Sequence, residues 1–120
     1  MYTGWSLTAN SVKQLENLYA PVHPDFIGHH ITYMFGNDSI KPEPATIKVI
    51  GHCVTDKVQC FVVEVNGSLI RPDGNFYHLT WSIDRSKGAK PVDSNAAIKT
   101  NGFDHIIAGI TLETVPNKFN

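Results

Sequence analysis

The sequence predicts an α+β fold with a compact, mostly antiparallel sheet and about two helices. Several short segments are rich in β-branched residues, strong turn signals separate them, and two stretches have helical character. Short hairpin-like connections between consecutive strands favour antiparallel pairing. The 120 residues contain no linker and no low-complexity tract, so we expect residues 1–120 to form a single domain.

The first part of the chain is expected to form a strand, a helix and a second strand. Residues 2–7 suit a first strand, and residues 26–35 suit the next one. Ser11 and Gln14 fit a capping box at the start of the intervening helix, and Pro21 ends it by excluding helical geometry from the residue before it. The apolar residues at helical spacing are Val12, Leu15, Leu18 and Tyr19.

A hairpin is predicted in the middle of the chain. Residues 45–54 and 58–65 are rich in β-branched side chains, and the polar residues between them suit a tight turn. This pairing would place Cys53 directly opposite Cys60. We expect both thiols to be reduced and partly buried, because the chain does not begin with the pattern of a secretory signal.

The last part of the chain is expected to form a strand, a short helix and a final strand. Residues 76–83 follow a strong turn signal and suit a strand. Ser94 is a candidate N-cap for a helix over residues 95–100, and residues 106–115 alternate as a last strand does. The inventory is therefore about six strands and two helices.

Composition and charge restrict the class of function. The net charge is −1, whereas proteins that grip duplex nucleic acid carry a basic excess to neutralise phosphates. A small or terminal nucleotide fits this charge better than a long duplex. No apolar run approaches the roughly 20 residues of a membrane span. We expect a cytoplasmic protein, encoded by a cell or a virus, that acts as a monomer or homodimer and has no membrane partner.

One internal repeat carries chemistry. His30-Ile31-Thr32-Tyr33 and His78-Leu79-Thr80-Trp81 share the order histidine, aliphatic, threonine, aromatic. Alternate residues of a strand face the same way, so the histidine and threonine of each copy are expected to project together. Two such strands near the middle of a sheet would surround one cavity with two imidazoles and two hydroxyls.

Such a cavity suits the cleavage of phosphodiesters. Opening a cyclic phosphate needs a base for the attacking water and an acid for the departing oxygen, and histidine can serve as either near neutral pH. Threonine hydroxyls can donate to the phosphoryl oxygens, where each donor is worth about 3 kcal/mol in the transition state. The scheme requires no metal and no cofactor, and no metal-ligand spacing is present.

The two motifs resemble those of the two-histidine (2H) phosphoesterase superfamily. Residues 28–36 and 77–83 are similar to its two motif strands, and residues 90–95 are similar to a segment of its small RNA-repair members. The resemblance implies a bilobal α+β domain with a central cleft, trimmed here because the chain is short. It also implies that His30 and His78 are the catalytic acid–base pair, with Thr32 and Thr80 holding the phosphate.

Further residues are candidates for binding substrate. Lys90 is expected to contact phosphate, and Tyr77 is a candidate for contact with a base. His29 should point away from His30, to the opposite face. Arg71, Arg85, Lys87 and Lys90 cluster around the second motif, where one or two of them are candidates to steer phosphate and the others should be solvated.

Two functions from different classes agree with these observations. The first is a metal-independent enzyme that cleaves RNA 2′,3′-cyclic phosphates or cyclic and 2′–5′ oligonucleotides. The second is a non-catalytic module that binds a nucleotide or an RNA end, for example a sponge for a signal nucleotide. Paired titratable histidines favour the enzyme, because binding alone does not require them. A purely structural role for both histidines is the third alternative.

Overall fold

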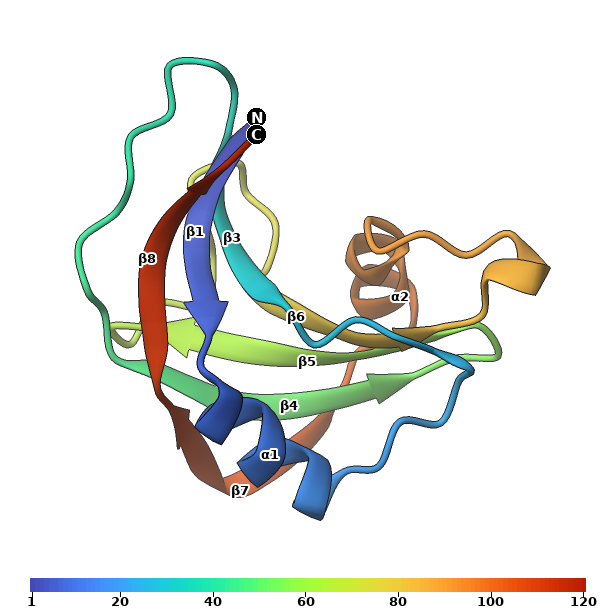
Figure 1. Ribbon diagram of the computed structural model, residues 1–120. Coiled ribbons are helices and arrows are strands. Elements are labelled where there is room, and N and C mark those ends of the chain that lie inside the picture. Colours follow the sequence, from blue (N-terminus) through green and yellow to red (C-terminus); the bar gives the residue numbers. More distant parts are fainter.

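The computed structural model describes all 120 residues and confirms the α+β class (Figure 1). Eight strands form one curled antiparallel sheet, with the strand order β7-β4-β5-β6-β3-β1-β8 and with β2 beside β6. The elements are β1 (Tyr2–Leu7), α1 (Ala9–Leu18), β2 (Asp25–Phe26), β3 (His30–Phe35), β4 (Ile47–Val54), β5 (Val58–Val65), β6 (His78–Ile83), a 3₁₀ turn (Arg85–Lys87), α2 (Asp93–Asn101), β7 (Asp104–Leu112) and β8 (Thr114–Phe119).

The sheet curls because its last two strands lie at opposite ends of the strand order. β7 pairs with β4, and β8 pairs with β1, although Glu113 alone separates them in the chain. Residue Tyr2 is level with Phe119, so the two ends of the chain lie side by side (Figure 1). The result is a half-barrel whose two edges approach each other at Glu113.

Helix α1 is capped earlier than the sequence predicted. Thr8 is the N-cap, and its hydroxyl oxygen accepts the backbone N–H of Ser11 at 3.2 Å. Ser11 instead lies inside the helix and donates its hydroxyl to the carbonyl oxygen of Glu113 at 2.7 Å. The capping box expected at Ser11 is therefore wrong, and Ser11 ties α1 to the junction of β7 and β8. Leu15 carries the apolar face of the helix into the core.

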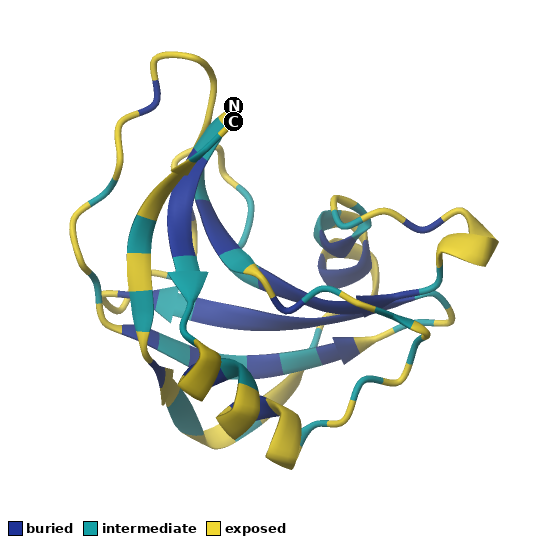
Figure 2. Ribbon diagram, viewed as in Figure 1, coloured by how far each residue is buried: buried dark blue, intermediate teal, exposed yellow.

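The two faces of the sheet bury separate clusters of side chains, and the central strands β5 and β6 are buried over most of their length (Figure 2). The cluster on the α1 side contains the two largest fully buried side chains, Trp81 and Phe61. The cluster on the other side includes Ile98 of α2, which covers part of β4, β5 and β6. Two clusters of this kind give the sheet a dry face under each helix and hold its centre rigid.

The start of α2 also differs from the prediction. Val92 is the N-cap, and no side chain caps this helix. Ser94 is fully buried in the first turn, where its hydroxyl lies 2.8 Å from that of Thr80. The N-cap expected at Ser94 is wrong, because this hydroxyl bonds to the neighbouring strand instead of to its own helix.

The strand expected over residues 26–35 is broken into β2 and β3. Gly28 has a φ of 50°, a left-handed conformation that favours glycine, and it interrupts the strand. The backbone N–H of Gly28 still bonds to the carbonyl oxygen of Thr80 at 3.1 Å, so the segment stays beside β6. A break of this kind changes which side chains face the same way.

The single last strand expected over residues 106–115 is divided at Glu113. Residues 106–112 lie in β7, and Thr114 begins β8, which runs on to Phe119. Pro116 lies within β8 and pairs in register with Trp5. Proline is tolerated there because β8 is an edge strand whose other side needs no hydrogen-bond donor.

The predicted hairpin is confirmed. β4 and β5 pair in antiparallel register, with Cys53 opposite Cys60, and both cysteines are buried and free. At the other side of the sheet, Gly4 allows β1 to approach β3 closely, because a Cβ there would overlap the carbonyl oxygen of Ile31. These contacts fix the strands on both sides of β6.

Candidate functional site

The two repeated motifs lie on adjacent strands at the centre of the sheet. β3 and β6 pair in antiparallel register through Ile31 and Leu79, the aliphatic residue of each motif and the second residue of each strand. A register centred on this pair places each histidine level with the threonine of the other motif. The two copies are thus related by a local two-fold arrangement, and their aliphatic residues are both fully buried on the α1 side.

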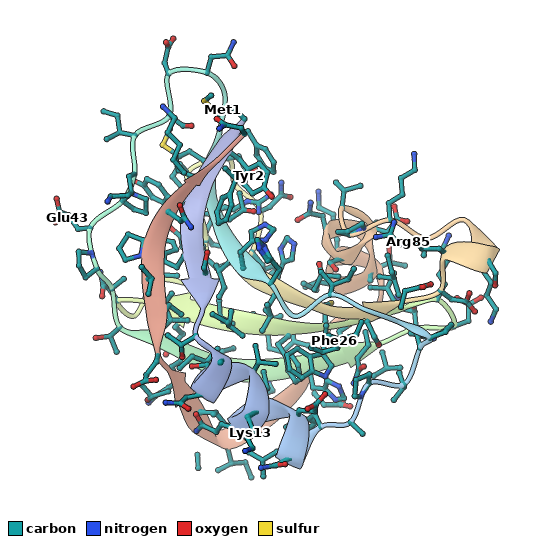
Figure 3. The ribbon with its side chains drawn as sticks, viewed as in Figure 1. Met1, Tyr2, Lys13, Phe26, Glu43 and Arg85 are labelled. Carbon is teal, nitrogen blue, oxygen red and sulfur yellow. The ribbon has the colours of Figure 1, made fainter.

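The histidines and threonines line one cavity of about 400 Å³ on the α2 side of the sheet. Figure 3 shows Tyr2 and Arg85 on opposite sides of the space above the sheet. The polar lining residues are His29, His30, Thr32, Arg71, His78, Thr80, Arg85 and Asn95, and the others are Tyr2, Ile27, Phe35, Pro91 and Val92.

The cavity is suited to an anion. Its lining includes Arg71 and Arg85 but no aspartate or glutamate. Arg71 is 3% exposed, its Nε donates to Oδ1 of Asp73 at 2.8 Å, and its guanidinium lies 5.3 Å from the centre of the Phe35 ring. Burial opposes ionisation of Asp73, but hydrogen bonds from Arg71 and Asn75 lower its pKa to about 2. The carboxylate therefore stays charged and holds the arginine in place.

His30 makes contacts through both ring nitrogens. Its Nε2 lies 3.0 Å from Oγ1 of Thr32, and its Nδ1 lies 2.9 Å from Nδ1 of His29. Burial, followed by electrostatic repulsion from the ionisable groups of His29, His78 and Arg71, lowers the pKa of His30 from 6.5 to about 4. His30 is therefore neutral at neutral pH and can accept a proton.

His78 is held by the backbone. Its Nδ1 lies 3.0 Å from the carbonyl oxygen of Phe76, which can only accept, so Nδ1 carries the proton. Nε2, the other ring nitrogen, takes no part in this bond and is available to a ligand in the cavity. Burial lowers the pKa of His78, while the bond to Phe76 acts in the opposite direction because it favours the charged ring.

The two threonines differ in their hydrogen bonds. Thr32 has Nε2 of His30 as its side-chain partner. Thr80 donates its hydroxyl to the carbonyl oxygen of Pro91 at 3.1 Å and also meets the hydroxyl of Ser94. Thr80 therefore ties the segment before α2 to the sheet. Its hydroxyl proton is donated to Pro91 and is not free to bond to a ligand.

The structure does not bring Lys90 and Tyr77 into the cavity. Lys90 is exposed and lies outside the lining, although Pro91 and Val92 beside it belong to the wall. Tyr77 is 5% exposed and packs against Trp5 on the α1 side, with 6.1 Å between the ring centres. Strand alternation turns Tyr77 away from the cavity because it directly precedes His78.

His29 does not point away from the cavity as expected. It directly follows the break at Gly28, so the alternation of a regular strand does not apply to it. Its ring is exposed, lines the cavity and contacts His30. The sequence signal for this was the glycine, since glycine inside a strand pattern indicates an irregularity.

Aromatic rings form the wall beside His30. Tyr2 stacks on Phe119 with 4.7 Å between the ring centres and lies 5.0 Å from the His30 ring. Phe35 is level with Tyr2, because a bulge in β3 after Thr32 shifts the alternation by one residue. The ring of Phe35 is 58% exposed, so an apolar surface remains open at the mouth of the cavity.

Comparisons with family models, with curated proteins and with solved structures find no match for this chain. No group of three or more His, Cys, Asp or Glu side chains is arranged to hold a metal ion. Neither helix is long and apolar enough to cross a membrane.

Proposed function

We propose that this cavity is the active site of a metal-independent phosphodiesterase of the 2H phosphoesterase type, acting on RNA 2′,3′-cyclic phosphates or on cyclic and 2′–5′ oligonucleotides. The observation that carries the proposal is the pairing of His30 and His78 on adjacent central strands around one anion-suited cavity. Histidine supplies both the base and the acid that such a cleavage needs.

The contacts of the two rings favour different roles. His30 is the base: its Nε2 removes a proton from the attacking water, whose oxygen then bonds to phosphorus. His78 is the acid in its charged form, in which both ring nitrogens carry a proton: Nε2 gives its proton to the departing ribose oxygen as the P–O bond breaks, and Nδ1 keeps its own. The carbonyl oxygen of Phe76 stabilises a charged His78, whereas Nδ1 of His30 faces another imidazole, which repels a second proton.

The charge that develops on the phosphoryl oxygens requires donors. Arg71 and Arg85 take this role in place of Lys90, and the Thr32 hydroxyl adds a neutral donor when a phosphate displaces it from His30. Arg71 is prepared for this by Asp73, which fixes one edge of the guanidinium. Donors held in position before the reaction stabilise the transition state without reorganisation.

The aromatic wall favours a substrate with a base. Phe35 offers an exposed ring near the two histidines, and base–aromatic stacking contributes about 1–3 kcal/mol per base. The base of a nucleoside phosphate would stack on the aromatic wall, and its phosphate would bind beside Arg71 and Arg85. A phosphate ester without a base would make only the second contact.

The family assignment stays part of the proposal. The two motifs support it, and so does the two-fold arrangement of β3 and β6. One departure is clear: the resemblance implies two pseudo-symmetric lobes, whereas the strand order here is continuous and a single residue pair joins β3 to β6. The lobes would correspond to the strands on either side of that pair.

One observation favours the alternative of a binding module. The hydroxyl of Thr80 is already donated to Pro91, so one of the two expected phosphate donors is occupied. A cavity with fewer free donors can still bind a nucleotide but stabilises a transition state less.

Incubation with nucleoside 2′,3′-cyclic phosphates and with cyclic di- and trinucleotides, in the presence of EDTA, separates the two functions. Chromatography should detect a hydrolysed product, and the product should disappear with His30→Ala or His78→Ala. Recovery of intact nucleotide together with a ligand-induced rise in Tm would instead support the binding module. Unchanged turnover in both folded variants would refute the His/His mechanism.

A further inference from the structure

We propose that His29 is a positioning residue that accepts the Nδ1 proton of His30 and so keeps Nε2 of His30 free to act as a base. The inference rests on the proposed function in naming His30 the base. The observation behind it is separate: the two Nδ1 atoms lie 2.9 Å apart, and one of them must donate.

Thr32 determines which ring donates. Its side chain is 7% exposed, and Nε2 of His30 is the partner of its hydroxyl, at 3.0 Å. If Nε2 carried the proton, the hydroxyl would lose its acceptor in the protein, and an unpaired buried donor costs about 1–3 kcal/mol. The hydroxyl therefore donates to Nε2, which leaves the proton of the neutral His30 ring on Nδ1, directed at His29.

His29 can accept this proton because its own ring reaches solvent. It is exposed, so its Nε2 can keep a proton by bonding to water while its Nδ1 stays unprotonated. A chain of three groups results, from the Thr32 hydroxyl through His30 to His29. The break at Gly28 is what allows two consecutive side chains to meet in this way.

The hydrogen bonds with Thr32 and His29 give His30 the same tautomer that a backbone hydrogen bond gives His78. Phe76 accepts the Nδ1 proton of His78 through its carbonyl oxygen, whereas His30 finds a side chain in that position. Both rings therefore direct an Nε2 atom without a proton toward the cavity in the neutral state. Orientation of a catalytic imidazole by a partner on its other nitrogen is a general requirement for acid–base catalysis.

Other groups also face His30 and are part of any test that varies pH. Tyr2 of β1 and Phe119 of β8 contact the ring, while His78 and Arg71 act on it through charge. His29 also contacts Phe119, with 5.4 Å between the ring centres, so its substitution removes this contact as well as the one to His30.

Three substitutions test the inference. His29→Asn places an amide oxygen near the position of Nδ1, His29→Gln places it near the position of Nε2, and His29→Ala removes the acceptor. His105→Asn is the matched control, because His105 is an exposed histidine that does not line the cavity. Long-range ¹⁵N–¹H NMR of the imidazoles reports the tautomer of His30 without any substrate.

We expect the Nδ1–H tautomer in the intact protein, in His29→Asn and in His105→Asn. His29→Ala and His29→Gln should show a substantial population of Nε2–H. Turnover of a nucleoside 2′,3′-cyclic phosphate should follow the tautomer: kcat falls at least about tenfold in His29→Ala and His29→Gln with little change in KM, and His29→Asn restores it.

Two results would overturn the inference: an Nε2–H tautomer of His30 in the intact protein, or a tautomer that is unchanged in His29→Ala. The NMR readout also separates this inference from the proposed function. If the tautomers respond as expected but the intact protein turns over no phosphodiester, His29 does position His30 and the proposed activity is refuted.

Discussion

Nε of Arg71 donates to Oδ1 of Asp73 at a distance of 2.8 Å, beside a cavity that contains no carboxylate of its own. Asp73 lies outside the cavity lining and is more exposed than Arg71, so its carboxylate pairs with the arginine without entering the cavity. This pair uses one donor of the guanidinium, which has five. The remaining donors are available to an anion in the cavity.

Replacement of Arg71 should therefore weaken catalysis. Arg71→Ala removes a positioned cation, and we expect kcat/KM for a nucleoside 2′,3′-cyclic phosphate to fall by about 100-fold. Steady-state kinetics on the folded variant measures the loss. Lys90→Ala is the control, because Lys90 is exposed and outside the lining; its kcat/KM should stay within about twofold of the intact protein. A larger loss from Lys90→Ala than from Arg71→Ala would show that the lysine holds the phosphate.

Replacement of either histidine of the motifs should nearly abolish turnover. Acid and base groups each contribute about 10²–10⁴-fold to rate, so His30→Ala and His78→Ala should each lose activity in this range. The comparison is made at saturating substrate with EDTA present, and circular dichroism establishes that the variants are folded. His105→Ala serves as the control and should keep its rate. Because the two histidines act in one step, the double variant should lose little more than either single variant.

The stability of the fold should depend on pH through His30. The pKa of His30 is about 4 in the folded protein and 6.5 without burial, so the unfolded chain binds more protons between these values. The free energy of unfolding should therefore be highest above pH 6.5 and fall as the pH decreases toward 4. The expected loss from this residue is about 3 kcal/mol.

Urea unfolding from pH 4 to pH 8 measures this dependence. His30→Gln should make it shallower, because glutamine does not titrate. His78, whose pKa burial also lowers, contributes in the same direction and will leave part of the slope in that variant. An identical pH dependence in His30→Gln and in the intact protein would show that His30 is protonated as easily in the folded state as in the unfolded chain.

Loss of the exposed aromatic ring should affect only substrates that carry a base. We expect Phe35→Leu to raise KM for a nucleoside 2′,3′-cyclic phosphate by about tenfold, in line with the loss of one stacking contact. The KM for a methyl riboside 2′,3′-cyclic phosphate, which has no base, should not change. Equal effects on the two substrates would indicate that Phe35 supports Arg71, which it contacts, instead of binding a base.

Regular alternation explains how much of the site was predictable. His30, Thr32, His78 and Thr80 lie on one face because each pair is two residues apart in a strand. The same rule already assigns Tyr77 to the opposite face, so its proposed contact with a base conflicted with the pattern.

Irregular features account for what the sequence did not predict. The break at Gly28 and the bulge after Thr32 change the direction of His29 and Phe35, and neither follows from a period of two. Arg71 was among the cations that the sequence offered for steering phosphate, but it reaches the cavity from a loop, where spacing does not say which of these cations will line it. β8 was missed because Pro116 interrupts its pattern, and an edge strand accepts proline only once its place in the sheet is known.

The pairing of β1 with β8 has a consequence for how the molecule is made. β1 leaves the ribosome before the other strands described here, but its partner β8 follows all of them. Contacts between such distant segments form slowly, because the chain loses the entropy of closing a long loop before these contacts can stabilise it. During synthesis β1 therefore waits with an open edge, and Tyr2 gains its stacking partner Phe119 only when nearly all of the described chain has emerged. In a nascent chain, the histidine strands β3 and β6 should therefore form before Tyr2 and Phe119 stack beside them. A chaperone that shields the edge of β1 would protect the nascent chain from aggregation in that interval.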